Sequence, residues 1–248
     1  MISVSISQAH VRFRQQQLFV DLDFKLAAGK TTCLLGPSGV GKSTLCRLLA
    51  GLPVSTQLHC FAYIEASDLK PLAGRIAYMS QRDGLMPWAS VMDNVLMPVK
   101  LSGLSTKPYR AKALKLLKQL GLPNTETMKP VQLSGGMRQR VAMARTLILE
   151  RSVILMDEPF TSLDAITRFR LQELAADLLE NKTALLVTHD PQEALRLGHH
   201  IYVLNGSPAK IHYHIDLSHD PVPRDLDSEV MTQYHNRILK ALVGDEAS

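Results

Sequence analysis

Polar and apolar side chains alternate through most of residues 4–26. A period of two is typical of strands with one buried face, so the pattern predicts two strands joined around residues 14–17. The short apolar run at 31–35 predicts a third strand. Helical spacing follows at 42–50, and a glycine and a proline just beyond it predict the end of a helix.

The pattern changes in the middle of the chain. Residues 54–73 fit neither period and predict at most a strand between loops, and a further strand is expected at 75–79. Residues 90–100 and 107–120 have helical spacing and are punctuated by prolines. We therefore expect a helical insert at 83–149 between two halves of a core.

Strand and helix patterns alternate beyond this insert. Helices are expected at 134–149, 165–180 and 191–197, strands at 153–156 and 183–188, closing strands at 201–204 and 210–215, and a last helix at 228–243. Such alternation predicts an α/β fold with a mainly parallel sheet. We expect one domain over 1–248, with a core of 1–82 and 150–205 and a closing segment of 206–248.

Composition limits the classes of protein that fit. Hydrophobic residues make up 46% and charged residues 21%, which is typical of a globular protein. The apolar runs are far shorter than the roughly 20 residues of a membrane span, so we expect none. Residues 1–10 lack the basic flank and apolar block of a signal peptide and predict a strand. The formal charge of +5 is mild and does not by itself indicate nucleic acid.

The cysteines and histidines do not indicate a metal site. Cys33, Cys46 and Cys60 are odd in number and lack C-x-x-C spacing, so we expect reduced thiols in the core. Four histidines also lack convincing metal spacing, and we expect them at the surface: His199, His200, His212 and His214.

Residues 36–43 read G-P-S-G-V-G-K-S between an apolar strand and a helix, the context that a phosphate-binding loop requires. Glycines let backbone N–H groups curl around phosphate oxygens. Lys42 would meet the β- and γ-phosphates, and Ser43 would offer its hydroxyl to Mg²⁺. The predicted ATP-binding residues here are Gly36, Pro37, Ser38, Gly39, Val40, Gly41, Lys42, Ser43 and Thr44. An ordinary glycine-rich turn is the weaker alternative in this context.

Two carboxylates follow the apolar strand at 153–156. Ligands bind at the carboxyl ends of strands in open α/β sheets. Asp157 is therefore expected to hold Mg²⁺ through water, and Glu158 to polarise an attacking water. A strand end that meets solvent is the alternative, and the phosphate-binding loop weakens it. Together the two motifs indicate a P-loop nucleoside triphosphatase, a class that includes kinases, GTPases and helicases.

A serine and two glycines stand before the helix at 134–149. Ser134 suits an N-cap, and Gly135 and Gly136 leave N–H groups exposed at the positive end of the helix. Elsewhere this would be an ordinary capped helix. Here the run L-S-G-G-M-R-Q-R resembles the ABC signature, with Met137 in place of glutamine. We expect the phosphate contacts to be kept, while contacts of Met137 to ribose or to a partner subunit stay open.

The resemblance to ATP-binding subunits of ABC transporters extends over nearly the whole chain, in the family's order. Gln81 matches the Q-loop glutamine, residues 162–164 match the D-loop with Asp164, and His189 matches the switch histidine. Phe13 stands, by spacing alone, where the family places an aromatic that stacks on adenine. A lone histidine or phenylalanine is more often structural, and the order of motifs reverses that weighting for His189.

The resemblance implies a head-to-tail dimer, of this chain or with a paired ATPase subunit. In it the phosphate loop of one subunit and the signature of the other enclose ATP and Mg²⁺. It also implies Glu158 as the base, His189 as the residue that holds the γ-phosphate and water, and Gln81 as a sensor. The residues implied at the metal are Ser43, Gln81 and Asp157.

Residues 85–88 and 91–95, L-M-P-W and V-M-D-N-V, are similar to a run in importers of nitrate, sulfonate, taurine and pyrimidine precursors. This implies uptake of a small polar or anionic nutrient through permease chains, with a solute-binding protein acting indirectly. The location implied is peripheral, at the cytoplasmic face of the inner (plasma) membrane. It also implies a groove beside the helical insert for a permease helix; for Trp88, a role as a loop anchor is the alternative, and both roles can hold together.

Three alternatives stay open: a soluble ABC ATPase acting on nucleic acid or the ribosome, an exporter ATPase, and an ATP-binding regulator that does not turn over. The chain lacks long coiled-coil or zinc inserts and an aromatic-basic patch, so we expect no nucleic-acid partner. Glu158 and His189 argue against the regulator.

Overall fold

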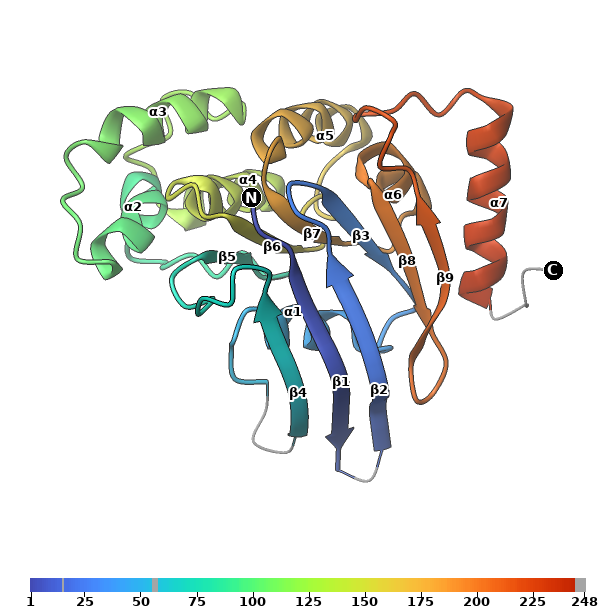
Figure 1. The fold of residues 1–248 in the computed structure, drawn as a ribbon. Coiled ribbons are helices and arrows are strands. Elements are labelled where there is room, and N and C mark those ends of the chain that lie inside the picture. The colour runs from blue at the N-terminus through green and yellow to red at the C-terminus, as the bar shows by residue number, and fades with distance from the viewer. Residues whose placement is uncertain (15, 55–57, 244–248) are drawn as a thin grey trace.

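The computed structural model describes residues 1–14, 16–54 and 58–243 (Figure 1). Within them, a small antiparallel sheet has the order β2-β1-β4 and a larger sheet the order β5-β6-β7-β3-β8-β9. The strands of the small sheet are β1 (Val4–Phe13), β2 (Gln16–Leu26) and β4 (Leu58–Ala66). Those of the large sheet are β3 (Thr31–Leu35), β5 (Ile76–Met79), β6 (Val153–Asp157), β7 (Thr183–Val187), β8 (His200–Asn205) and β9 (Lys210–Asp216).

Helices pack mainly against the large sheet. They are α1 (Lys42–Leu49), α2 (Val91–Leu101), α3 (Tyr109–Gln119), α4 (Gly135–Leu147), α5 (Ala165–Leu179), α6 (Pro191–Leu197) and α7 (Glu229–Val243), with a 3-10 turn at Pro130–Gln132. None of the helices in the described part of the chain is both long and apolar enough to cross a membrane.

The large sheet is parallel except at β9, which pairs antiparallel with β8. All residues of β3, β6 and β7 are buried, as expected for parallel strands covered on both faces. Successive side chains of a strand point to opposite faces. On β6, Val153 and Leu155 join the core that holds α1 and the small sheet, whereas Ile154 and Met156 join the core that holds α2–α7. Figure 1 shows these layers.

The turn at 86–90, just before α2, is fixed by one buried amide. Asn94 is fully buried, and its Oδ1 accepts a hydrogen bond from the Met86 N–H at 2.7 Å. Its Nδ2 donates to the carbonyls of Met86 and Ser90 at 3.2 and 3.0 Å. Trp88 lies inside this turn with its side chain 72% exposed, so the chain holds a large apolar side chain in water.

The last helix packs against the edge of the large sheet that β8 and β9 form (Figure 1). Asn205, at the end of β8, donates from Nδ2 to the carbonyls of Ala241 and Leu242 at 2.9 and 3.0 Å. Ile238 and Ala241 are buried. This helix therefore closes the core around the end of β8.

The strands and helices expected from the sequence are present, and the α/β P-loop fold class is confirmed. Three expectations about single residues are wrong. His200 is expected at the surface, but its side chain is 16% exposed and its Nδ1 is buried. Cys60 is exposed, because it lies on the edge strand β4. His199 is half-buried, and its Nδ1 accepts a hydrogen bond from the Thr31 N–H at 3.1 Å. Burial, chiefly, lowers the pKa of His199 to about 4.

Candidate functional site

Parallel pairing of β3, β6 and β7 brings three loops to one edge of the sheet. Beyond the strand ends, the Thr188 N–H donates to Leu34 O at 3.1 Å and the Glu158 N–H donates to Val187 O at 2.9 Å. The loop after β3 carries the phosphate-binding motif, the loop after β6 carries Glu158, and the loop after β7 carries His189. The order of strands therefore places these motifs side by side.

The phosphate-binding loop needs glycine at Gly41 for two reasons. Its φ of +110° is in the region that L side chains rarely adopt, and a Cβ built there would lie 2.6 Å from the ring of Phe19. Gly41 also precedes α1 without a side-chain cap, so the first N–H groups of α1 have no capping partner from that residue. Such N–H groups form an anion site at the positive end of a helix.

Lys42 folds back over this loop. Its side chain is buried, and Nζ donates to Gly36 O at 2.7 Å and to Pro37 O at 3.0 Å. Burial lowers the pKa of Lys42, while the nearby Glu158 and Asp157 act in the opposite direction. A phosphate placed in the loop would offer this ammonium a charged acceptor in place of two neutral carbonyls.

Asp157 fits a cation. It is 2% exposed, and burial raises its pKa, opposed by a hydrogen bond with Ser43. Its Oδ1 is buried and has no hydrogen-bond partner among the described residues. A buried carboxylate without a full set of partners is costly, and a divalent cation at oxygen ligands would relieve that cost. Asp157 and Ser43 therefore suit Mg²⁺.

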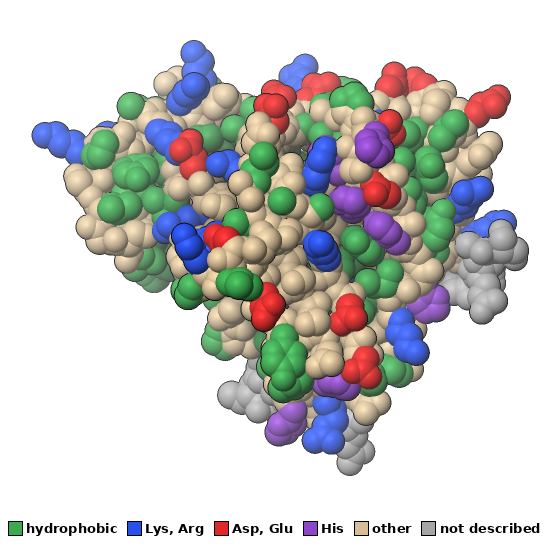
Figure 2. All heavy atoms as spheres, in the orientation of Figure 1, with side chains coloured by type: hydrophobic (Ala, Val, Ile, Leu, Met, Phe, Trp, Pro, Cys, Tyr) green, Lys and Arg blue, Asp and Glu red, His purple; other side chains and the backbone are tan. Residues whose placement is uncertain are grey.

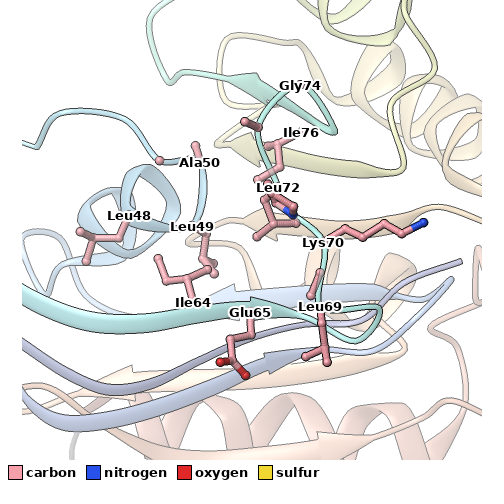
Figure 3. Close-up of a pocket in the computed structure, with 14 residues that line it drawn as sticks. Leu48, Leu49, Ala50, Ile64, Glu65, Leu69, Lys70, Leu72, Gly74 and Ile76 are labelled. Atoms are coloured by element: carbon pink, nitrogen blue, oxygen red, sulfur yellow. The ribbon is translucent and has the colours of Figure 1, made fainter.

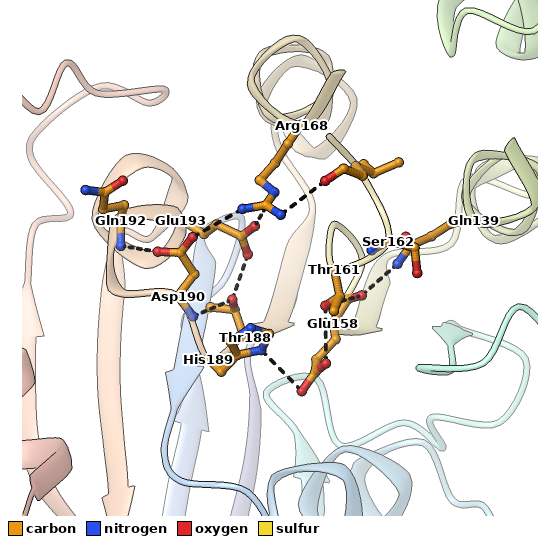
Figure 4. A network of polar contacts seen from close by, with 11 residues as sticks. Gln139, Glu158, Thr161, Ser162, Arg168, Thr188, His189, Asp190, Gln192 and Glu193 are labelled. Atoms are coloured by element: carbon orange, nitrogen blue, oxygen red, sulfur yellow. Dashed lines mark hydrogen bonds and ion pairs between the residues drawn. The ribbon is translucent and has the colours of Figure 1, made fainter. Parts of the chain in front are cut away.

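Glu158 lies where the three loops meet. Gln81 donates from Nε2 to Glu158 Oε2 at 3.1 Å, and Thr161 donates from Oγ1 to the same oxygen at 3.2 Å. His189 Nδ1 lies 3.6 Å from Glu158 Oε1, and Figure 4 shows the two side chains pointing toward each other. The side chain of Glu158 is 15% exposed. The structure thus brings together Gln81, Glu158 and His189, which the sequence separates by up to 108 positions (189 − 81).

Two further residues hold this loop and were given no role in the sequence prediction. Gln139, which is buried in α4, donates from Nε2 to Glu158 O at 2.8 Å and accepts from the Ser162 N–H at Oε1 at 3.0 Å (Figure 4). Thr161 is the other. Gln139 lies in the signature run, where spacing alone does not reveal a contact with the loop after β6.

The signature lies at the start of α4. Ser134 caps it, because Oγ accepts from the Met137 N–H at 3.2 Å. Gly136 packs on the D-loop, where a Cβ would lie 3.2 Å from Ser162 O. Met137 is partly buried against the core, so part of this side chain stabilises the fold. Ser134 makes no hydrogen bond to the phosphate-binding loop in the described part of the chain.

Asp164 and Phe13 lie further from this centre. Asp164 is the N-cap of α5, and its Oδ1 accepts from the Thr167 N–H at 2.9 Å; that hydrogen bond is the first cause of its lowered pKa. Phe13 ends β1 with its side chain 37% exposed and pairs with Gln16. Gln16 lines a hollow of about 210 Å³ together with residues 37–40. The adenine role of Phe13 stays a prediction.

A larger hollow of about 560 Å³ lies elsewhere, between the end of α1, β4 and the loop before β5 (Figure 3). Its wall is mainly apolar, with Leu48, Ile64 and Leu72 among its residues and with Glu65 and Lys70 at its side. None of its lining residues belongs to the phosphate-binding loop or to the group around Glu158. It is therefore separate from the candidate nucleotide site.

Comparisons with known proteins agree with this geometry. The sequence model of a family described as ABC transporter matches residues 19–161. An uncharacterized ABC transporter ATP-binding protein of Haemophilus influenzae is 42% identical over 246 residues, covering 98% of this chain and 100% of that protein. A taurine import ATP-binding protein of Pseudomonas aeruginosa is 39% identical, covering 85% and 79%. An aliphatic sulfonates import ATP-binding protein of Delftia acidovorans is 37% identical, covering 93% and 90%.

Solved structures show the same fold. A dimeric ATP-binding cassette in a post-hydrolysis state, bound to ADP and Pi, has a TM-score of 0.75 and 27% identity, covering 86% of this chain and 98% of that one. The ATP-binding subunit of another ABC transporter has a TM-score of 0.74 and 20% identity, covering 99% and 95%. The second supports the fold alone.

Proposed function

Because this chain belongs to the family of ABC transporter ATP-binding subunits, which bind and hydrolyse ATP, we propose that it drives the uptake of a small anionic nutrient through permease chains. The observation that carries the proposal is the group of Gln81, Glu158 and His189 beside the phosphate-binding loop. The relatives named for the import of taurine and of aliphatic sulfonates support import as the direction and a sulfonate as the class of nutrient.

In the proposed mechanism, Lys42 leaves the carbonyls of Gly36 and Pro37 and binds the phosphates of ATP. Glu158 holds the attacking water, takes a proton from it at a carboxylate oxygen, and is oriented by Gln81. His189 holds the water and the γ-phosphate in line. Mg²⁺, which Ser43, Asp157 and Gln81 would hold, supplies positive charge against the phosphate oxygens when bound.

Two copies of the site would face each other. The N-terminal ends of α1 and α4 each carry backbone N–H groups at a positive helix end, and one such end does not neutralise a triphosphate. We propose a head-to-tail dimer in which Ser134, Gly135 and Gly136 meet the phosphates bound by the partner. The dimeric cassette with a similar fold supports this arrangement.

A permease helix is proposed to dock across two hollows that flank β5. One is the hollow of Figure 3, and the other, of about 290 Å³, is lined by Tyr78, Leu101 and Leu149 among others. Ile76 lines both hollows. Leu101 is 81% exposed, and Trp88 offers a second exposed apolar side chain on the same helical insert. Arg145, which lines the smaller hollow, donates hydrogen bonds to the carbonyls of Asp83 and Gly84, so docking there would connect the segment after Gln81 with the permease.

The proposal places the chain at the cytoplasmic face of the membrane, peripherally, with a solute-binding protein acting on the other side. Figure 2 shows basic and acidic side chains interspersed over one face of the molecule, a pattern that does not favour a nucleic-acid partner there.

The test is ATP hydrolysis by the purified chain, alone and with vesicles that carry the permease from the same source. We expect slow basal hydrolysis that rises with the permease and rises further with the solute-binding protein loaded with a sulfonate. A rate of ATP hydrolysis that does not change with the permease but rises with DNA or ribosomes would overturn the import proposal. Trp88→Ala should abolish the stimulation and keep the basal rate.

A further inference from the structure

The D-loop and the switch loop follow neighbouring strands. Residues 162–164 come after β6 and precede α5, while His189 comes after β7 and precedes α6. Between them lies Arg168, in the first turns of α5, with its side chain 34% exposed (Figure 4). Its position allows one guanidinium to reach both loops.

Arg168 contacts each loop. Its Nη2 donates to Leu163 O in the D-loop at 3.2 Å. Its Nη1 lies 3.7 Å from Asp190 Oδ2, and its Nε lies 3.8 Å from Glu193 Oε1. The Nε is buried and has no hydrogen-bond partner among the described residues. The two ion pairs are longer than hydrogen bonds, so a small movement of either loop would tighten or break them.

The carboxylates that Arg168 contacts are connected to the residues on either side of His189. Glu193 is 7% exposed, and its Oε2 accepts from Thr188 Oγ1 at 2.6 Å. Thr188 Oγ1 in turn accepts from the Asp190 N–H at 3.1 Å. These bonds hold the residues on both sides of His189. Burial raises the pKa of Glu193, and the hydrogen bond from Thr188 and, to a smaller extent, the charge of Arg168 oppose that shift.

The D-loop that Arg168 contacts is in turn packed against the signature at the start of α4. Gly136 packs against Ser162 and Leu163, and Gln139 accepts from the Ser162 N–H. A continuous series of contacts therefore runs from the start of α4, through the D-loop and Arg168, to the loop of His189. Gln139 in this series is buried, whereas Arg168 is partly exposed, so the coupling depends on the polar contacts of Arg168 with the two loops and not on close packing.

We propose that Arg168 is a positioning residue that sets the place of His189 according to the position of the D-loop. The inference rests on the proposed function: ATP of the partner subunit at the signature would move the D-loop, and Arg168 would pass that movement to the switch histidine.

The test compares wild type, Arg168→Gln, Arg168→Lys and, as matched control, Arg170→Ala, an exposed arginine on the same helix. We expect Arg168→Gln to lower kcat about 10- to 100-fold, the range for a misplaced catalytic group, with KM for ATP within about twofold. Arg168→Lys keeps the positive charge but loses the planar guanidinium with its several donors, so its kcat should lie between those of wild type and Arg168→Gln. The control should match wild type, and the melting temperatures should agree.

A double-mutant comparison and a trapping measurement separate positioning from folding. Glu193→Gln should lower kcat, and adding it to Arg168→Gln should cost no more than Arg168→Gln alone. In a Glu158→Gln background, Arg168→Gln should still form the ATP-bound dimer. Additive losses of kcat, a loss of dimer, or an equal fall in ATP affinity and melting temperature would each overturn the proposal. Lack of hydrolysis by wild type would instead overturn the proposed function.

Discussion

Gln139 offers a prediction whose magnitude follows from two hydrogen bonds. The Gln139→Met change keeps the volume of the buried side chain and removes both polar contacts, the donor to Glu158 O and the acceptor for the Ser162 N–H. Because shape is kept, the cavity cost of a truncation is avoided. The loss is therefore confined to two backbone groups of the loop after β6.

Each lost hydrogen bond costs about 0.5–1.5 kcal/mol, and a group left buried without a partner costs about 1–3 kcal/mol. Glu158 is partly buried, so its carbonyl is expected near the lower half of that range, and Ser162 is exposed, so water can satisfy its N–H. We expect Gln139→Met to lower the free energy of unfolding by about 1.5–3 kcal/mol.

The relative loss of kcat should exceed the relative loss of stability, because the hydrogen bond to Glu158 O fixes the backbone that carries the base. Urea unfolding would be measured beside kcat at saturating MgATP, with Gln139→Glu as the matched variant. That variant keeps an acceptor for Ser162 but places a carboxylate against the Glu158 carbonyl. Unfolding within about 0.5 kcal/mol of wild type together with unchanged kcat for Gln139→Met would refute this reasoning.

Further predictions concern the phosphate-binding loop, the two carboxylates and one histidine. Gly41→Ala should abolish ATP binding, measured by fluorescence of a nucleotide analogue, because a Cβ meets a buried ring; Gly39→Ala, with open space, should bind better than Gly41→Ala. Glu158→Gln should keep ATP binding and lower kcat about 100-fold or more, and unchanged turnover would exclude the base. Asp157→Asn should raise the Mg²⁺ concentration needed for half-maximal turnover, with ATP affinity in EDTA unchanged. For His199, neutral when folded with a pKa of about 4, stability should be full above pH 6.5 and fall between 6.5 and 4; His199→Gln should flatten this fall in thermal melts, and an equal slope would contradict it.

The sequence predicts the centre of the large sheet well because β3, β6 and β7 are short apolar runs, and a strand buried on both faces has little other choice of residues. The small sheet is harder at β4. Its side chains at Phe61 and Tyr63 are each 52% exposed and touch each other edge to face, so hydrophobic residues mark no buried face. Pairing with β1 makes residues 58–66 a strand, and pairing is not visible in a local pattern.

Contacts between side chains far apart in the sequence could be predicted only for residues that belong to a recognised motif. Arg168 and Gln139 have no periodic signal, because each makes polar contacts with loops that the fold brings close. Met137 shows the opposite case. The sequence leaves the consequence of this departure from glutamine open, and the structure shows that the methionine packs partly against the core. A thioether fits an irregular apolar space without needing a hydrogen-bond partner.

The register of the sheet explains why three catalytic candidates meet at all. Met79 pairs with Met156 across β5 and β6, so Gln81 and Glu158 both lie two residues beyond a matched pair. Asp157 pairs with Val187 across β6 and β7, so His189 is two residues beyond that pair and Glu158 one. A shift of one residue in either pairing would turn every side chain of a strand to the opposite face and separate these groups. The apolar runs of β6 and β7 therefore support catalysis indirectly, because burial of both faces of these strands fixes the register on which the geometry of hydrolysis depends.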